Sequence, residues 1–256
     1  MTTFILKLIA ILSMTIDHTG AVLGLKYVNG YFYLSGLIPL ETYNILRAIG
    51  RIAFPIYCYL IVEGYYHTKN VKKYMLRLFS FAIISQIPFS LAVFKSATEL
   101  KSLNVFFTLF FGLVCVYLTD IAKKQYYMSK EHHNPDLIRY LIGVPVAIIL
   151  IMILAMLIHT DYDAFGILLI LLFYFFRQDQ TKPITDKNNA LKFIWLFLSM
   201  AASIYVFVNP TELFALVAML PIALHNHKKG PSMKYVFYAY YPVHLLALYG
   251  IYTLLI

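Results

Sequence analysis

An aspartate and a histidine stand side by side inside the first apolar run of the chain, in Ile16-Asp17-His18-Thr19. Inside membrane hydrocarbon an ionisable residue costs several kcal/mol, so it is retained mainly where it has a partner and a task. An imidazole can act as a general base or carry an acyl group. Neighbouring helical residues diverge by about 100°, so the two side chains face different partners. We expect His18 to do chemistry, with hydrogen bonding to a carbonyl as its alternative role. Asp17 either does chemistry or pairs with an arginine.

The second apolar run carries two pairs of ionisable residues at helical spacing. Arg47 and Arg51 are four residues apart and therefore share a helix face. Arg51 is a plausible counter-ion for Asp17. Glu63 and His67 repeat the spacing near the far end of the run, just before a basic turn. They are either part of a site or a helix-end pair that holds this turn.

Neutral polar residues interrupt the next two apolar runs. Gln86 lies in Ser85-Gln86-Ile87-Pro88, where the proline frees a backbone carbonyl. Asn104 and Thr108 share a face of the following run. Such residues either join helices by hydrogen bonds or contact a substrate, and the sequence leaves both roles open.

Two more candidates lie toward the C-terminus. The acidic connection His159-Thr160-Asp161-Tyr162-Asp163 leads directly into a short apolar run. The last run is interrupted by Tyr240-Tyr241-Pro242-Val243-His244, which places Tyr240 and His244 on one helix face. A proline beside a buried histidine favours a functional site over simple packing, so Asp161 and His244 are added to the candidates.

The elements that position these residues are predicted to be membrane-spanning helices. Of the 256 residues 61% are hydrophobic and 13% charged, against roughly 45–50% and 25% in soluble domains. The net charge of +9 comes from Lys and Arg in short connections, which determine topology and do not form a nucleic-acid surface. Cys58, Cys115 and the pair His132-His133 lack the spacing of a metal site. We expect an all-α polytopic bundle that binds neither metal nor nucleic acid.

Nine apolar segments can be drawn, each bounded by charge or by Gly, Pro and Asn. They are residues 4–25, 45–66, 74–94, 103–122, 138–158, 164–177, 191–208, 211–224 and 235–255. The sixth and eighth are short for a span of about 20 residues, so they are tilted, re-entrant or half-helices. Because neither a second domain nor an internal repeat stands out, residues 1–256 are predicted to form one transmembrane domain.

The charges of the connections predict the orientation. Connections after the second, fourth, sixth and eighth segments are rich in Lys and Arg, and the alternate ones are poor in them. By the positive-inside rule, the N-terminus is cytoplasmic. The outer half of the membrane then holds Asp17, His18, Arg47, Arg51, Gln86, Asn104, Thr108, Asp161 and His244. The inner face holds Glu63, His67, Lys69, Lys72, Lys73 and Arg77. This division suits a protein that takes an anionic donor from the cytoplasm and acts on something outside.

Several stretches, in order along nearly the whole chain, resemble the TraX family. They are KLIAILSMTIDHTG (7–20), the FP, EG and HT pieces of 51–77, SQIPF (85–89), NVFFTLFFG (104–112), DYDAFGILLILLFY (161–174) and KYVFYAYYPVHL (234–245). The family is named for a conjugative-plasmid protein that acetylates the N-terminus of the pilus subunit. It is distantly similar to transmembrane acyltransferases with an essential histidine in an early helix.

The resemblance implies a multi-pass acetyltransferase of the cell (cytoplasmic) membrane. Acetyl-CoA is the implied donor, and the acceptor is a pilin-like protein, a peptide or a cell-surface glycan. By analogy His18 is the general base or acetyl carrier. Asp17 or Asp161 would stabilise its imidazolium, Arg51 or Asn104 the oxyanion, and His244 completes the catalytic candidates. The donor-binding candidates are Arg47, Glu63, His67, Lys69, Lys72, Lys73, Arg77, Gln86, Asn104 and Thr108.

Two other classes of function compete with this interpretation. A secondary transporter or flippase also has proline-broken helices, short segments and buried charges, but it should show paired halves, and no repeat is visible. A purely structural role in the membrane does not explain why His18 and Arg51 are retained at that depth. Acetyl transfer is therefore the leading hypothesis.

Overall fold

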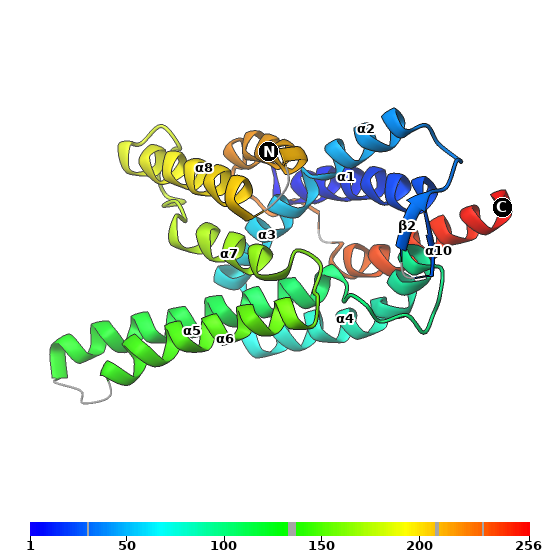
Figure 1. Ribbon diagram of the computed structural model, residues 1–256. Coiled ribbons are helices and arrows are strands. Elements are labelled where there is room, and N and C mark those ends of the chain that lie inside the picture. Colours follow the sequence, from blue (N-terminus) through cyan, green and yellow to red (C-terminus); the bar gives the residue numbers. More distant parts are fainter. Residues whose placement is uncertain (30, 133–136, 208–209, 232) are drawn as a thin grey trace. The chain divides into compact units, whose positions relative to one another are not determined.

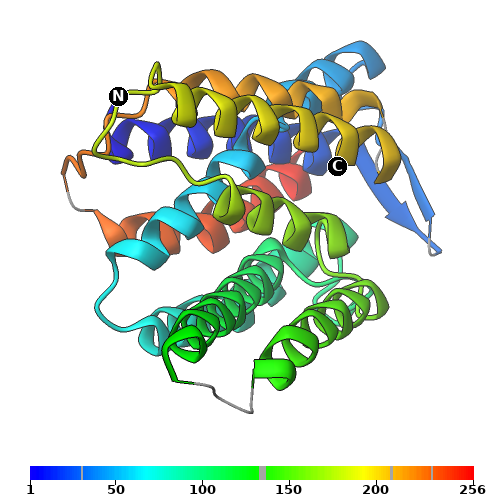
Figure 2. The same ribbon diagram turned by 90° about the vertical axis from the view of Figure 1, so that its left-hand side faces the viewer.

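The chain folds mainly into helices, as a computed structural model shows (Figures 1 and 2). The structure describes residues 1–29, 31–132, 137–207, 210–231 and 233–256. The helices are α1 (Thr3–Gly24), α2 (Leu40–Gly50), α3 (Ala53–His67), α4 (Val71–Phe94), α5 (Val105–His132), α6 (Leu137–Leu157), α7 (Asp163–Phe175), α8 (Lys187–Phe207), the 3-10 helix η1 (Pro210–Ala218), α9 (Met219–Ala223) and α10 (Lys234–Leu255). The predicted helical class is confirmed.

A short antiparallel hairpin joins α1 to α2 and was not anticipated from the sequence. Strands β1 (Leu25–Val28) and β2 (Tyr31–Leu34) pair with Leu25 opposite Leu34 and Val28 opposite Tyr31. Its residues are rich in Tyr, Val and Phe, which favour strands. Each strand has only four residues and lies in a connection between two long apolar runs, so its pattern is too short to stand out.

Six helical stretches in the described part are long and apolar enough to cross a membrane. They are Thr3–Gly24, Leu40–His67, Val71–Phe94, Val105–Met128, Tyr140–Leu157 and Lys187–Val206. The predicted short sixth and eighth segments correspond to the shorter apolar helices Asp163–Phe175 and Glu212–Ala223. The composition and length of these helices are those of a multi-pass membrane protein. The count of nine spans and the orientation remain predictions.

The second predicted segment, residues 45–66, is divided into α2 and α3 at Arg51 and Ile52. The physical reason is Pro55, which has no N–H to donate to the carbonyl of Arg51, four residues earlier. Arg51 instead ends α2, with its own N–H donating to the carbonyl of Arg47 at 3.2 Å. The break thus falls at Arg51, the second of the two arginines.

The chain divides into two compact units, which we describe separately. The first contains residues 1–60, 83–100 and 176–256, and the second contains residues 61–82 and 101–175. In the first unit α1 packs against both α2 and α10. Small residues of α1 allow this approach: a Cβ atom on Gly24 would lie 2.5 Å from the ring of Tyr43, and one on Gly20 would lie 3.0 Å from Leu46. Small residues four apart are a common way for membrane helices to pack closely.

In the second unit α5 packs against α6 and α7, and Figure 1 shows α5 and α6 side by side. Gly112 of α5 permits the contact with α7, because a Cβ atom there would lie 2.2 Å from Ile170 Cδ1. At one end of the unit the backbone of Leu103 bridges to Thr160. These contacts bring the connection before α5 next to the connection between α6 and α7.

Candidate functional site

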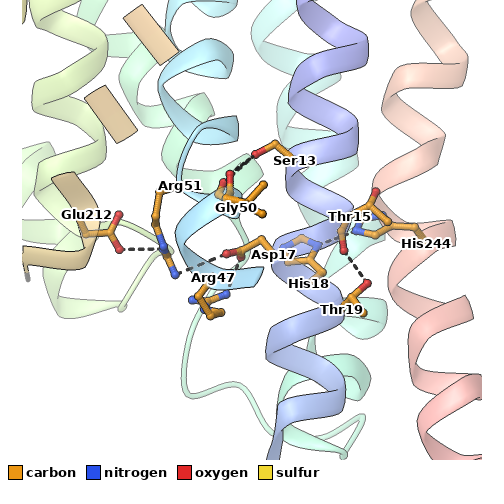
Figure 3. A network of polar contacts seen from close by, with 11 residues as sticks. Ser13, Thr15, Asp17, His18, Thr19, Arg47, Gly50, Arg51, Glu212 and His244 are labelled. Carbon is orange, nitrogen blue, oxygen red and sulfur yellow. Dashed lines mark hydrogen bonds and ion pairs between the residues drawn. The ribbon is translucent and has the colours of Figure 1, made fainter. Parts of the chain in front are cut away.

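Four charged side chains form a line of alternating sign in the first unit (Figure 3). Arg47 Nη1 lies 2.6 Å from Asp17 Oδ2, Arg51 Nη2 lies 3.6 Å from Asp17 Oδ1, and Arg51 Nη1 lies 2.8 Å from Glu212 Oε1. Arg47 is the most exposed, at 27% of its side chain, and the others are between 11% and 13% exposed. The line joins α1, α2 and η1, and its charges compensate one another. Asp17 therefore has arginine partners, as expected, although Arg47 is closer than Arg51.

Local packing explains why Asp17 reaches both arginines. Gly50, at the end of α2, leaves the space that the aspartate side chain fills: a Cβ atom on Gly50 would lie 2.2 Å from Asp17 Oδ1. Ser13, one turn earlier on α1, donates to the carbonyl of Ile49 at 2.7 Å. The last carbonyls of a helix need such outside donors. Ser13 and Gly50 thus fix the end of α2 against the face of α1 that carries Asp17.

The neighbouring residue, His18, points to a different helix and meets His244 of α10 (Figure 3). His18 Nδ1 lies 2.6 Å from His244 Nε2. The two rings are nearly parallel, at 11°, and their centroids are 4.9 Å apart. Since the nitrogen atoms are much closer than the centroids, the rings meet edge to edge, as a linear N–H···N hydrogen bond requires. The structure therefore brings Asp17, His18, Arg47, Arg51 and His244 together.

Tyrosines of α10 surround the histidine pair. His244 Nδ1 lies 2.8 Å from the carbonyl oxygen of Tyr240, one turn earlier. The Tyr240 ring is parallel to that of His244 at 5.0 Å, and its hydroxyl lies 2.7 Å from Thr15 Oγ1. The ring of Tyr241 stands edge-on to both histidines, at 5.8 Å from His18 and 5.7 Å from His244. His18 itself is half-buried.

Lys95 clamps the far ends of the helices that carry the two histidines. Its Nζ atom donates to the carbonyls of Val22 at 3.0 Å and Ala92 at 2.6 Å, and it lies 3.9 Å from the ring centroid of Tyr252. Burial lowers the pKa of Lys95 to about 8. The ammonium group thus joins the ends of α1, α4 and α10, and so helps to hold His18 against His244.

The remaining outer candidates have the contacts of residues that join or brace helices. Gln86 Nε2 donates to Ser90 Oγ at 3.3 Å within α4. In the second unit Asn104 Nδ2 donates to the carbonyl of Ala82 at 2.7 Å, and the Thr108 hydroxyl donates to the carbonyl of Asp161. These bonds favour the helix-joining alternative for Asn104 and Thr108. Asp161 takes part through its backbone, whose N–H also donates to Leu103.

The inner candidates lie around the turn between α3 and α4. His67 Nδ1 donates to the carbonyl of Glu63 at 2.8 Å and lies 4.0 Å from Glu63 Oε2, which is the helix-end pairing considered above. Asn70 caps α4 by accepting from the N–H of Lys73 at 2.9 Å. Three lysines are exposed, and Arg77 lies over the ring of Tyr74. The exposed lysines are Lys69, Lys72 and Lys73.

Sequence reasoning missed Glu212 and the contact between Tyr240 and Thr15. Glu212 lies at the boundary of the eighth apolar segment and was counted with a connection, yet it is buried and paired with Arg51. The available signal was the charge balance: Asp17 can neutralise only one of the two arginines in the second apolar run. Glu212, at the edge of a short apolar segment, could supply the second negative charge. No group of three potential metal ligands occurs in the described part of the chain. His133 lies outside that part.

Comparison with known proteins gives a consistent result. Residues 3–252 match the family described as TraX protein. A protein of Dichelobacter nodosus named "Probable fimbrial assembly protein FimC, serogroup H1" is 26% identical over 262 residues, which cover 96% of this chain and 93% of the relative. No solved structure gives a significant match.

Proposed function

Since the chain belongs to the TraX family, we propose that it is a multi-pass acetyltransferase of the cell (cytoplasmic) membrane. It would move an acetyl group from cytoplasmic acetyl-CoA to a hydroxyl or amine at the outer face. The observation that carries the proposal is the hydrogen-bonded pair of His18 and His244 inside apolar helices, next to a buried carboxylate held by two arginines. Ionisable groups at such depth indicate a working site.

The proposed chemistry uses His18 as the general base. As the oxygen or nitrogen of the acceptor forms a bond to the acetyl carbon, its proton passes to His18. The carbon–sulfur bond of the thioester then breaks, and the leaving thiolate recovers that proton from His18. In the second route that the residues allow, His18 carries the acetyl group between the two substrates. Arg47, the most exposed member of the charged line, is suited to stabilise the oxyanion.

The donor would bind through its phosphates at the turn between α3 and α4. Lys69, Lys72 and Lys73 are exposed there, and Arg77 follows one turn later on α4. Positive charge in this concentration attracts an anion. Because Asn104 and Thr108 already bond backbone carbonyls, we propose that the basic turn, and not these residues, binds the donor.

Contacts within the first unit support the predicted alternation of spans. The start of α1 bonds the connection between α9 and α10, through Thr3 to Lys228 and Phe4 to Lys229. The opposite end of α1 meets the ends of α4 and α10 through Lys95. The end of α4 and the whole of α10 therefore run parallel to α1, as odd-numbered spans must. With the positive-inside rule, these parallel neighbours fit a cytoplasmic N-terminus and nine spans.

The name of the Dichelobacter protein concerns fimbrial assembly. By extension, we propose a pilin-like protein or peptide as the acceptor, in preference to a glycan. An exposed N-terminal amine or a hydroxyl of such a subunit, delivered at the outer face, would be the group that His18 deprotonates.

The proposal is tested with the full chain in nanodiscs. Radiolabelled acetyl-CoA is supplied with pilin-derived peptides that carry either a free or a blocked N-terminus, and CoA release and peptide labelling are measured. The native protein should label an acceptor and His18→Ala should not, whereas His159→Ala, at an exposed histidine, should match the native rate. Absence of both acetyl-CoA binding and transfer in the native protein refutes the proposal. Native transfer by His18→Ala refutes the role of His18.

A further inference from the structure

The hydrogen bonds of His244 determine which of its ring nitrogens carries hydrogen. A carbonyl oxygen can only accept, so the Nδ1 atom that lies 2.8 Å from the Tyr240 carbonyl must donate. In neutral His244 the other nitrogen, Nε2, then holds a lone pair. His18 Nδ1, 2.6 Å from that lone pair, must donate in turn. Neutral His18 is therefore left with its own lone pair on Nε2.

We propose that His244 is a positioning residue that holds His18 in the tautomer protonated on Nδ1, with Nε2 free to react. The proposal rests on the acetyl transfer proposed above. A catalytic base commonly needs a third group that fixes its tautomer and orientation. Here the chain of donors runs from His18 to His244 and ends at the Tyr240 carbonyl.

Asp17 does not fill this role, although it is adjacent to His18 in the sequence. Its Oδ2 atom bonds Arg47 at 2.6 Å and its Oδ1 atom faces Arg51 at 3.6 Å. A second, unpaired carboxylate beside His18 would bring another charge into the apolar interior. A neutral imidazole orients His18 without that additional charge. When His18 Nε2 receives the proton of the acceptor, His244 Nε2 can accept the proton on His18 Nδ1 more strongly and so share the positive charge.

Contacts on α1 hold His244 in its orientation. Thr15 donates its hydroxyl to the carbonyl of Ile11 at 2.8 Å, so it accepts from the Tyr240 hydroxyl, 2.7 Å away. This bond fixes the ring of Tyr240, which is parallel to the ring of His244. Thr15 lies one turn before His18 on the same helix. Helix α1 therefore carries His18 and, through Thr15 and Tyr240, also holds the ring of His244.

The test compares His244→Gln with His244→Leu. The glutamine oxygen can accept from His18 Nδ1 and its amide can donate to Tyr240, whereas leucine can do neither. Since general base catalysis contributes about 10²- to 10⁴-fold, we expect His244→Leu to lower kcat by about 10²-fold or more with little change in KM for acetyl-CoA. His244→Gln should remain within about tenfold of the native kcat.

Nitrogen NMR of ¹⁵N-histidine-labelled protein at pH 8 reads the tautomer directly and does not depend on activity. The His18 signals, identified by their absence in His18→Ala, should show a protonated Nδ1 and a bare Nε2, and His244→Leu should lose this preference. A native His18 protonated on Nε2 overturns the proposal, even if acetyl transfer is observed. The predicted tautomer in a native protein without transfer activity leaves the geometry intact and refutes the proposed function instead.

Discussion

Gly50 and Asp17 are in such close contact that a methyl group on the glycine would lie 2.2 Å from the carboxylate oxygen Oδ1. The aspartate side chain thus fills the volume in which any other residue at position 50 would place its Cβ atom. The carboxylate depends on this vacancy to reach Arg47 and Arg51.

Gly50→Ala should displace Asp17 and destabilise the protein. We expect a loss of about 1–3 kcal/mol, the usual result of overpacking, together with reduced transfer activity. Unfolding by SDS titration in mixed micelles measures the first and the labelling assay the second. Gly143→Ala is the matched control, because a Cβ atom there meets nothing within 4 Å. Equal effects of the two substitutions would contradict the packing argument.

The pairing of Asp17 with Arg47 should contribute more to stability than an exposed ion pair does. A double-mutant cycle with Asp17→Asn and Arg47→Gln should give a coupling energy of at least about 1 kcal/mol. The reference is the pair of Lys124 and Asp120, whose lysine is 71% exposed although the nitrogen–oxygen distance is 2.8 Å. Lys124→Gln should cost less than about 1 kcal/mol. A coupling near zero for the first pair would show that its arginine is held by other contacts.

The helical segments were predictable because each is a long apolar run between charged or turn residues. The sequence also predicted that the first apolar run carries site residues, since ionisable residues such as Asp17 and His18 are unusual inside hydrocarbon. An arginine partner for Asp17 was expected and is present. The partner of His18 was not predictable, because the contact with His244 joins segments more than two hundred residues apart. Glu212 was missed for the same reason: its burial follows from its pairing with Arg51, not from its local sequence.

The pKa of Lys95, lowered to about 8 by burial, predicts a dependence of stability on pH. Between that value and about 10.4, the ordinary pKa of lysine, the folded protein binds fewer protons than the unfolded chain. Its free energy of unfolding should therefore rise with pH through this window. The increment should be absent in Lys95→Met and present in Lys101→Met, a substitution at an exposed lysine. SDS titrations at pH 7.5, 8.5 and 9.5 measure the free energy of unfolding of the native protein and of the two variants. If this free energy changed with pH to the same extent in all three proteins, the result would contradict the burial of Lys95.

The basic turn should affect donor binding without affecting the chemical step. Replacing Lys72 and Lys73 together by Glu should raise KM for acetyl-CoA by about tenfold, equivalent to roughly 1.4 kcal/mol, and leave kcat near the native value. The increase should shrink at high salt, since exposed charges are screened. Lys187→Glu, in a different basic connection and also exposed, should leave KM unchanged. A similar increase in that variant would indicate a general effect of charge instead of a site.

The predicted orientation can be tested on a single helix, because exposed residues flank both ends of α4. Lys72 lies in its first turn, and Thr98 lies four residues beyond its last residue, Phe94. Cys58 and Cys115 are buried and can be replaced by Ala to give a background without thiols. In intact cells a membrane-impermeant maleimide should label Thr98→Cys but reach Lys72→Cys only after permeabilisation. Lys187→Cys should behave like Lys72→Cys, since both positions are predicted to be cytoplasmic. Labelling of Lys72→Cys and Thr98→Cys from the same side would remove α4 from the list of spans. The reverse pattern would invert the orientation and place the histidine pair in the inner half of the membrane.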